Sequence, residues 1–217
     1  MKTIQKNQEE ASVFLDEANF SLGLRYLTAR DLELAAIVER LGPPPMWERE
    51  PGFPTLMHII LEQQVSLASA RAAYQRLLAA VSPLTPERFL VLDDSQLKTI
   101  GFSRQKTAYG RNLARTIIEG ELDVSALDSM DDATVRRELM KITGIGRWTA
   151  DIYLLMALRR ADVWPGGDLA LAVAVQKIKK LERRPAPEEL TALSSAWRPW
   201  RAVAARILWH YYLSKRV

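Results

Sequence analysis

The chain has 217 residues, 48% of them hydrophobic and 26% charged, which is typical of a folded protein with one large domain or two lobes. It has no cysteine, which excludes disulfides, thiolate metal sites and cysteine-ligated iron–sulfur clusters, and no apolar run is long enough for a signal peptide or a membrane span. The net charge of +4 is modest, but basic residues dominate 177–217 and 98–115, as suits a partner with a phosphate backbone.

The predicted elements are almost all helices, because apolar residues recur at three- and four-residue spacing and alternating strand patterns are nearly absent. In chain order, the predicted helices cover residues 32–41, 53–61, 68–81, 109–118, 135–142, 150–158, 169–181 and 196–213. Breaks rich in proline and glycine separate most of them. Polar side chains at Thr85, Ser103 and Asp168 are each expected to cap the start of a helix. The sequence therefore predicts an all-α fold.

These breaks also suggest how the chain divides. Residues 60–160 are expected to form a central helical lobe. Residues 1–59 are expected to pack with residues 161–217, so that the two ends of the chain complete a second lobe. The division predicts a cleft between the lobes.

A glycine hairpin stands out in the stretch ITGIGRW at 142–148. Gly144 and Gly146 are expected to adopt backbone angles closed to other residues, so that the chain turns tightly with its amides facing outward. A helix beginning near Arg147 would aim unpaired amides at the same point, where they favour an anion. Since residues 130–142 also form a plausible helix, we expect a helix–hairpin–helix that holds a DNA phosphate. A simple tight turn is the alternative from these residues alone.

Asp168 directly follows a Trp-Pro-Gly-Gly turn and precedes a predicted helix. Its carboxylate could cap that helix, could be aimed into the cleft by the turn, or could do both. Asp162 and Asp151 are weaker candidates, because Asp162 precedes the turn and Asp151 lies within the helix that follows the hairpin.

Taken together, these motifs resemble the helix–hairpin–helix (HhH-GPD) DNA glycosylase superfamily and its 3-methyladenine glycosylase II, or AlkA-type, branch. The pattern L-x-x-I-x-G-I-G-x-W-T-A-D at 139–151 is followed by P-G-G-D at 165–168. Residues 53–78, 101–114 and 197–213 are similar to the family's early helix and DNA-facing loop, its middle segment and its last helix. The resemblance covers most of the chain beyond residue 30. It implies a two-lobed, all-helical fold without the N-terminal β domain of some members.

The resemblance also implies an activity. The chain would be a monofunctional DNA glycosylase that excises alkylated bases, chiefly 3-methyladenine and 7-methylguanine, in base excision repair. Asp168 matches the family's catalytic aspartate, whose carboxylate would stabilise positive charge on the sugar and orient a water molecule. Trp148 stands where bifunctional relatives carry a lysine that forms a Schiff base, so strand nicking is not expected. No cofactor is expected.

Several further site residues are implied by the same resemblance. Aromatic faces would replace the stacking that an extruded base loses, and cationic bases favour indole rings. The residues matching the base pocket are Trp148, Trp209 and Ile152, the last at a position that is aromatic in the best-known relatives. The residues matching DNA contacts are Gly144, Gly146, Arg147, Thr149, Ser103, Lys106, Gln63, Gln64 and Ser66. Gln64 stands at the position of the wedge that fills the gap left by the base.

The expected partner is double-stranded DNA that carries a damaged base, bound by a monomer in the cytoplasm or, in a eukaryote, the nucleus. No metal site built from side chains is expected, because the only histidines, His58 and His210, are far apart in the sequence. In the family the hairpin often holds a monovalent cation through carbonyls, which would here be those of Met140, Ile142 and Ile145.

Two other functions stay open. A non-catalytic helix–hairpin–helix module that senses damage would keep the hairpin but would not need an acid, so Asp168 with Trp148 and Trp209 discriminates against it. A glycosylase for a different lesion, such as hypoxanthine, is the second alternative.

Overall fold

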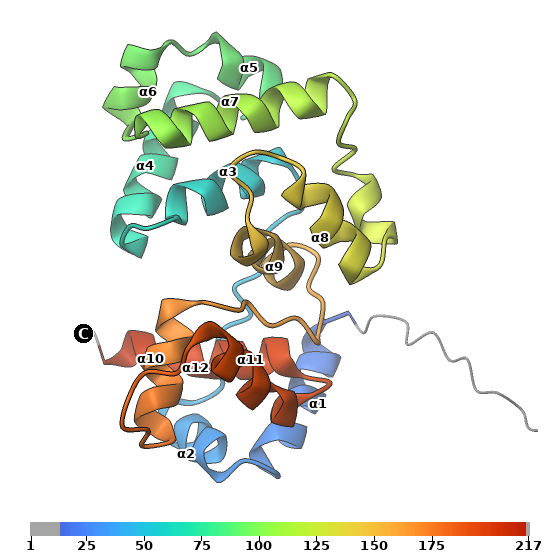
Figure 1. Ribbon diagram of the computed structural model, residues 1–217, viewed down its shortest axis with the longest axis vertical. Helices are drawn as coiled ribbons and strands as arrows, with labels where there is room; N and C mark the ends of the chain where they lie inside the picture. The colour runs from blue at the N-terminus through green and yellow to red at the C-terminus, as the bar shows by residue number, and fades with distance from the viewer. Residues whose placement is uncertain (1–13, 216–217) are drawn as a thin grey trace, which may run out of the picture.

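Figure 1 shows the computed structural model, which describes residues 14–215. Within this range the chain forms twelve α-helices and two short 3₁₀ helices without any β-strand, which confirms the predicted all-α fold. The first thirteen residues of the predicted segment 1–59 and the last two of 161–217 lie outside the described residues. None of the described helices has the length and apolar content needed to cross a membrane.

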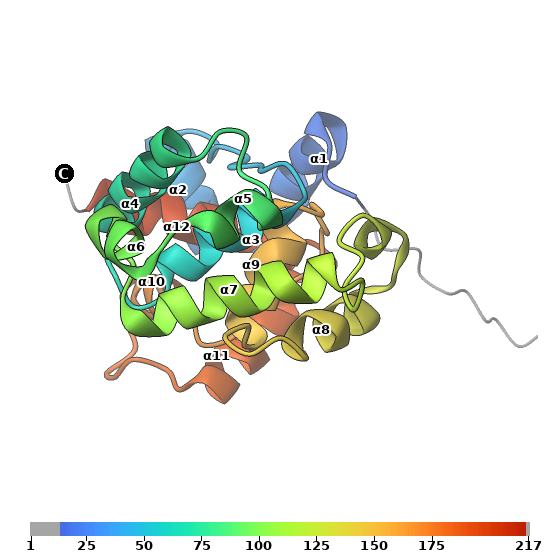
Figure 2. The same cartoon turned by 90° about the horizontal axis from the view of Figure 1, so that it is seen from above.

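The helices gather into two groups, and the larger group is built from the middle of the chain (Figure 1). Its helices α3 and α9 pack on each other, α4 and α7 pack on α3, α5 packs on α7, and α8 packs on α9. Figure 2 looks down on this group and shows α7 lying over α3. The α-helices of this group are α3 (Phe53–Glu62), α4 (Leu67–Ala80), α5 (Pro86–Val91), α6 (Asp94–Ile100), α7 (Arg104–Ile118), α8 (Asp132–Met140) and α9 (Arg147–Met156).

The smaller group is built from both ends of the described chain. Helix α12 lies at its centre, where it contacts α1, α2 and α10, and most of its residues from 202 to 209 are fully buried. The α-helices of this group are α1 (Glu17–Thr28), α2 (Leu32–Leu41), α10 (Leu169–Ile178), α11 (Pro187–Ser194) and α12 (Arg201–Ser214). The chain passes between the groups twice, through residues 42–52 and 157–168 (Figure 1).

A buried arginine ties the two groups together where the chain crosses. Arg206 on α12 is fully buried, and burial lowers its pKa to about 10, so it remains charged at neutral pH. Its guanidinium donates hydrogen bonds to the carbonyl oxygens of Met46 (2.6 Å), Leu155 (2.9 Å) and Ala202 (3.0 Å). Because Met46 lies in the first crossing segment and Leu155 on α9, one side chain joins α12 to the other group.

The predicted helices agree with the structure for residues 32–41 and, to within a few residues at each end, for most of the others. The three predicted caps are confirmed, since Thr85, Ser103 and Asp168 each accept a hydrogen bond from a backbone amide of the helix that follows. The helix predicted over 196–213 is wrong at its start, because residues 195–197 form a 3₁₀ helix and α12 begins only after Pro199. Helices α1, α6 and α11 were not among those predicted.

The predicted domain boundaries, 1–59, 60–160 and 161–217, remain a prediction. Helix contacts show which elements pack together, but they do not define where a domain begins. The boundary between residues 59 and 60 falls within α3, and this helix packs against α4, α7 and α9.

Candidate active site

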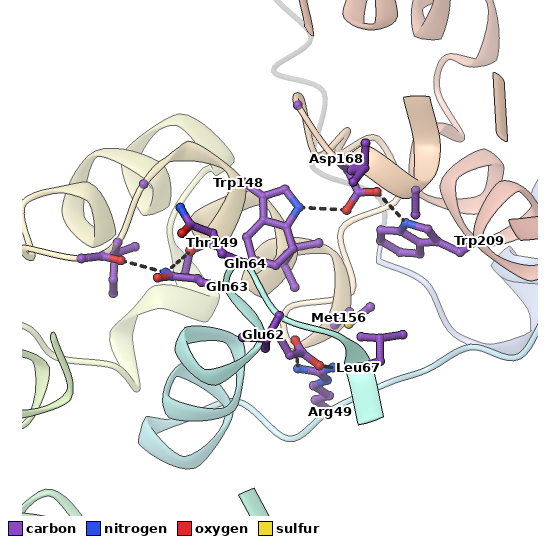
Figure 3. A pocket seen from close by; sticks show the side chains of 18 of the residues that line it. Arg49, Glu62, Gln63, Gln64, Leu67, Trp148, Thr149, Met156, Asp168 and Trp209 are labelled. Atoms are coloured by element: carbon purple, nitrogen blue, oxygen red, sulfur yellow. Dashed lines mark hydrogen bonds and ion pairs between the residues drawn. The ribbon is translucent and has the colours of Figure 1, made fainter. Parts of the chain in front are cut away.

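A cleft of about 1390 Å³ lies between the two groups of helices. Its walls come from the loop after α3, the hairpin before α9, α9 itself, the turn before α10, and α12 (Figure 3). Three of the predicted site residues, Arg147, Ser103 and Lys106, do not line it. The predicted residues that do line it are Gln63, Gln64, Ser66, Met140, Ile142, Gly144, Ile145, Gly146, Trp148, Thr149, Ile152, Asp168 and Trp209.

Asp168 reaches the cleft through the tight turn that precedes α10. Gly167 has a φ of +82°, a left-handed conformation that favours glycine. The amide of Asp168 donates to the carbonyl of Pro165 (3.3 Å), which closes the turn. One carboxylate oxygen, Oδ1, then accepts a hydrogen bond from the amide of Leu171 (2.9 Å) and caps the helix. The turn and the cap together fix where the carboxylate stands.

Two indole groups hold the same carboxylate from the cleft side. Trp148 Nε1 donates to Oδ2 of Asp168 (2.9 Å), and Trp209 Nε1 donates to Oδ1 (3.2 Å), as Figure 3 shows. Asp168 is 8% exposed, and no ion pair among residues 14–215 includes it. Neutral N–H donors and the start of α10 favour a negative charge without neutralising it. A carboxylate without a cationic partner among the described residues therefore lines the cleft.

The other two aspartates considered from the sequence are differently placed. Asp151 is fully buried and is held by Arg136 (2.5 Å) and Arg147 (3.1 Å). Burial raises the pKa of Asp151, and the two guanidinium groups oppose that rise. Asp162 pairs with Arg198 (3.2 Å) and Arg201 (2.8 Å). Neither aspartate lines the cleft.

The hairpin between α8 and α9 uses its two glycines for different reasons. Gly144 has a φ of +99°, and a Cβ there would lie 2.2 Å from the ring of Tyr109. Gly146 has a φ of −92°, which any residue can adopt, so the expectation of a special backbone angle is correct for Gly144 and wrong for Gly146. Gly146 is the N-cap of α9, and no side chain there bonds the first amides of the helix. These amides are therefore left for another acceptor.

Gln63 and Thr149 connect the hairpin to the loop after α3. Gln63 Nε2 donates to the carbonyl of Gly144 (2.9 Å) and to Oγ1 of Thr149 (3.0 Å). Thr149 is almost fully buried, so its hydroxyl faces Gln63 and not solvent. Arg147 is exposed at the start of α9 and is held by Asp151. The structure thus gives Gln63 and Thr149 a bracing position behind the hairpin.

The loop from Gln64 to Leu67 stands at the mouth of the cleft. Gln64 is exposed with a φ of +56°, a left-handed conformation that costs a non-glycine residue about 1–2 kcal/mol. Ser66 caps α4 by accepting from the amide of Ser69 (3.2 Å). Val65 and Leu67 are exposed apolar side chains on the same rim. A strained loop with exposed side chains is typical of a ligand-contacting segment.

Ser103 and Lys106, predicted as a second phosphate site, are both engaged within the protein. Ser103 caps α7 by accepting from the amide of Lys106 (3.2 Å). The Lys106 ammonium donates to the carbonyl of Leu61 (2.7 Å) near the end of α3, and partial burial lowers its pKa. The phosphate site at these residues remains a prediction.

Among residues 14–215, no group of three or more histidine, cysteine, aspartate or glutamate side chains could hold a metal ion. The carbonyl of Ile142, one of the three predicted to hold a monovalent cation, accepts a hydrogen bond from the amide of Ile145 (3.0 Å). The cation site remains a prediction.

The cleft also holds an ion pair that was not predicted from the sequence. Arg49 donates two hydrogen bonds to Glu62, at 3.1 and 2.7 Å, and the two side chains are 20% and 10% exposed. In Figure 3 they lie on the opposite side of the pocket from Asp168. One signal could have revealed the pair: Glu62 ends the apolar helix FPTLMHIILE, where the helix dipole disfavours an acid.

The chain is similar to proteins that repair DNA. The model of the HhH-GPD superfamily of base excision DNA repair proteins matches residues 57–199. YfjP of Bacillus subtilis is 30% identical over 184 residues, which cover 81% of this chain and 64% of YfjP. The alkylbase DNA glycosidase-like protein mag2 of Schizosaccharomyces pombe is 24% identical over 201 residues, which cover 89% of this chain and 94% of mag2.

A solved structure is also similar over almost its whole length. It is that of the Schizosaccharomyces pombe 3-methyladenine DNA glycosylase Mag1 in complex with abasic DNA. The two chains are 25% identical with a TM-score of 0.81, and the match covers 87% of this chain and 95% of Mag1.

Proposed function

The chain belongs to the HhH-GPD superfamily of base excision DNA repair proteins, and we propose that it is a monofunctional DNA glycosylase that hydrolyses the N-glycosidic bond of alkylated bases, chiefly 3-methyladenine and 7-methylguanine. The observation that carries the proposal is the setting of the Asp168 carboxylate, which lines the cleft, accepts from two indole N–H groups and has no cationic partner among residues 14–215. Mag1 and mag2, named for alkylated bases, support this substrate class.

Damaged double-stranded DNA is the partner, and the hairpin holds its backbone. The uncapped amides at the start of α9, beside Gly144 and Gly146, donate hydrogen bonds to a phosphate, and the helix dipole adds to the attraction. The exposed side chain of Gln64 at the mouth of the cleft fills the gap that the extruded base leaves in the duplex. One chain supplies all of these parts, so the protein acts as a monomer in the compartment that holds the DNA.

In the cleft, the extruded base lies against the rings of Trp148 and Trp209, where a cationic purine gains cation–π attraction. Breakage of the bond between the sugar C1′ and the base nitrogen places positive charge on the sugar, and the Asp168 carboxylate stabilises that charge. Water then attacks C1′, and its proton passes to the carboxylate and on to solvent. An alkylated base leaves readily because its positive charge is neutralised as the bond breaks.

The cleft also explains why water and not an amine attacks. No lysine is among the residues that line it in the part of the chain that the structure describes, and Trp148 occupies the second position after Gly146. A Schiff base, which strand-nicking relatives need, requires an amine within reach of C1′. The reaction therefore stops at an abasic site.

The test is release of methylated bases from DNA treated with an alkylating agent, measured for the natural chain and for Asp168→Asn. Asparagine keeps the size of the side chain and can still cap α10, but it carries no charge. We expect the natural chain to release 3-methyladenine and 7-methylguanine, and the variant to do so about 10²–10³ times more slowly with unchanged affinity for duplex DNA.

Two outcomes would contradict the proposal. Undiminished release by Asp168→Asn would remove this carboxylate from the mechanism. Absence of release by both proteins, with duplex binding intact, would indicate a non-catalytic module that senses damage.

A further inference from the structure

We propose that Glu62 and Arg49 bind the edge of the extruded purine and make the cleft selective for bases that carry an exocyclic amino group. The inference rests on the proposed function, since it names the chemical group that the same cleft recognises. Its starting observation is a charged pair that lines the cleft but has no part in the chemistry at Asp168.

The position of Glu62 is unfavourable for folding alone. It is the last residue of α3, where the partial negative charge of the helix end repels a carboxylate. It is also only 10% exposed, and removing a charged pair from water costs several kcal/mol per ion before the pair attraction is counted. Apolar side chains of similar volume would often serve stability equally well. A function in the cleft accounts for keeping the charges.

The pair is held rigidly, as a recognition group must be. Arg49 binds both carboxylate oxygens of Glu62, and the backbone amide of Arg49 donates to the carbonyl of Met156 at the end of α9 (3.0 Å). On another side, His58 Nε2 lies 3.7 Å from Oε1 of Glu62, and the His58 ring stacks on Tyr74 with centroids 4.1 Å apart. Arg49 is thus fixed by the end of α9, and Glu62 is fixed by Arg49 and flanked by His58, which lies outside the cleft.

The carboxylate keeps capacity for a ligand. A carboxylate has about four acceptor positions, and Arg49 uses two of them. Since Glu62 lines the cleft on the side opposite Asp168, a base whose sugar lies at Asp168 extends its far edge toward Glu62 (Figure 3). An amino group on that edge can then donate a charge-assisted hydrogen bond.

The chemistry of alkylated purines fits this acceptor. The 2-amino group of 7-methylguanine and the 6-amino group of 3-methyladenine are both donors, and the positive charge of the alkylated nucleoside strengthens them. Hypoxanthine has no amino group. Arg49 adds donors for a ring nitrogen or carbonyl beside the amino group. The pair therefore distinguishes amino purines from their deaminated counterparts.

The test compares two bases that differ only in the amino group, 7-methylguanine and 7-methylhypoxanthine. Each is placed in the same duplex as its 2′-fluoro nucleoside, which resists glycosidic cleavage, and the affinity of the protein for each duplex is measured. We expect the natural chain to bind the 7-methylguanine duplex about tenfold or more tightly, the gain of one hydrogen bond to a charged group.

The variant for this test is Arg49→Met with Glu62→Leu, which removes both charges and keeps the apolar volume, so that the fold is retained. We expect its affinities for the two duplexes to agree within about twofold. The matched control is Arg183→Met with Glu189→Leu, because this pair is also doubly hydrogen-bonded (2.9 and 2.6 Å) but is exposed and outside the cleft. The control should keep the natural preference.

Three results would overturn the inference: equal affinity of the natural chain for both duplexes, a preference that survives in the double variant, or loss of the preference in the control. These results are independent of catalysis, because the bases are not released. Failure of the proposed function is seen separately, as absence of base release from ordinary methylated DNA.

Discussion

Asp151 and Asp168 are both buried carboxylates, but the protein treats their charges in opposite ways. Two arginines surround Asp151, so its charge is cancelled inside the fold. Within the described part of the chain, Asp168 accepts from N–H groups of Trp148, Trp209 and the backbone of α10 and pairs with no cation. Burial alone therefore does not decide whether a carboxylate is matched by a cation. What matters is whether the neighbours leave a charge that a substrate can meet.

The largest effects are expected when each aspartate is neutralised in turn. Asp151→Asn leaves Arg136 and Arg147 beside an uncharged amide, and removal of one partner of a buried pair costs about 3–5 kcal/mol. We expect its Tm to fall by about 10 °C, while base release per folded molecule changes less than about threefold. Asp168→Asn should show the reverse pattern. Thermal unfolding and release rates measured on both variants would contradict the comparison if the two patterns were alike.

In the hairpin, the conformation of the backbone can be changed without changing any charge. Gly144→Ala places a methyl group against Tyr109 in a left-handed conformation, and we expect it to cost about 2 kcal/mol of stability and roughly tenfold in affinity for duplex DNA. Gly146→Ala is the control, since its φ is ordinary and no atom lies within 4 Å of the new methyl group. It should change stability by less than about 0.5 kcal/mol. Equal losses in both variants would refute the assignment.

A smaller effect is expected from the donors to Asp168. Trp148→Phe removes one N–H group and keeps most of the aromatic face, so base release should slow by about fivefold to tenfold. Trp164→Phe is a matched control, because the buried Trp164 Nε1 has no hydrogen-bond partner within residues 14–215. Its release rate should be unchanged. A rate for Trp148→Phe equal to that of the natural chain would mean that the indole N–H does not position the carboxylate.

The smallest effect concerns pH on the other side of the cleft, beside Glu62. Burial lowers the pKa of His58 from its usual value of 6.5, Arg49 lowers it further and Glu62 opposes both, while Tyr74 stacks on the ring. The folded chain therefore binds a proton less readily than the unfolded chain. The contribution of His58 to stability is full above pH 6.5 and is lost as the pH falls from there through its folded value. We expect His58→Gln to flatten the fall in Tm between pH 7 and 5 by about 2 °C. An identical slope in both proteins would contradict this.

Local patterns in the sequence were enough to predict most of the helices, the hairpin and the cap at Asp168. Each depends on residues a few positions apart, where turn chemistry and periodicity act directly. The partners of Gln63 and Lys106 could not be predicted in this way, because Gly144 and Leu61 lie far from them in the chain. Gln63 and Lys106 were therefore predicted to contact DNA, whereas the structure shows both bonded to groups within the protein.

The Arg49–Glu62 pair was not predicted for a different reason. Its sequence signal is a local rule that is broken, an acid at the negative end of a helix, and such exceptions are expected at functional sites. The rule that glycine marks a special backbone angle also fails at Gly146, because its φ is ordinary. Here the glycine instead leaves the first amides of α9 without a side-chain cap.

The buried Arg206 bears on how the protein would distinguish damaged from intact nucleotides. By anchoring α12 to Met46 and Leu155, it opposes movement of the two groups of helices away from each other. A cleft that moves little spends little free energy on closing around a base. The free-energy cost of extruding the base then comes from unstacking and unpairing the DNA. A damaged base that already stacks or pairs poorly is extruded at a lower free-energy cost than an intact one. A cleft held in place by Arg206 would therefore favour damaged bases through the instability that they cause in the DNA duplex.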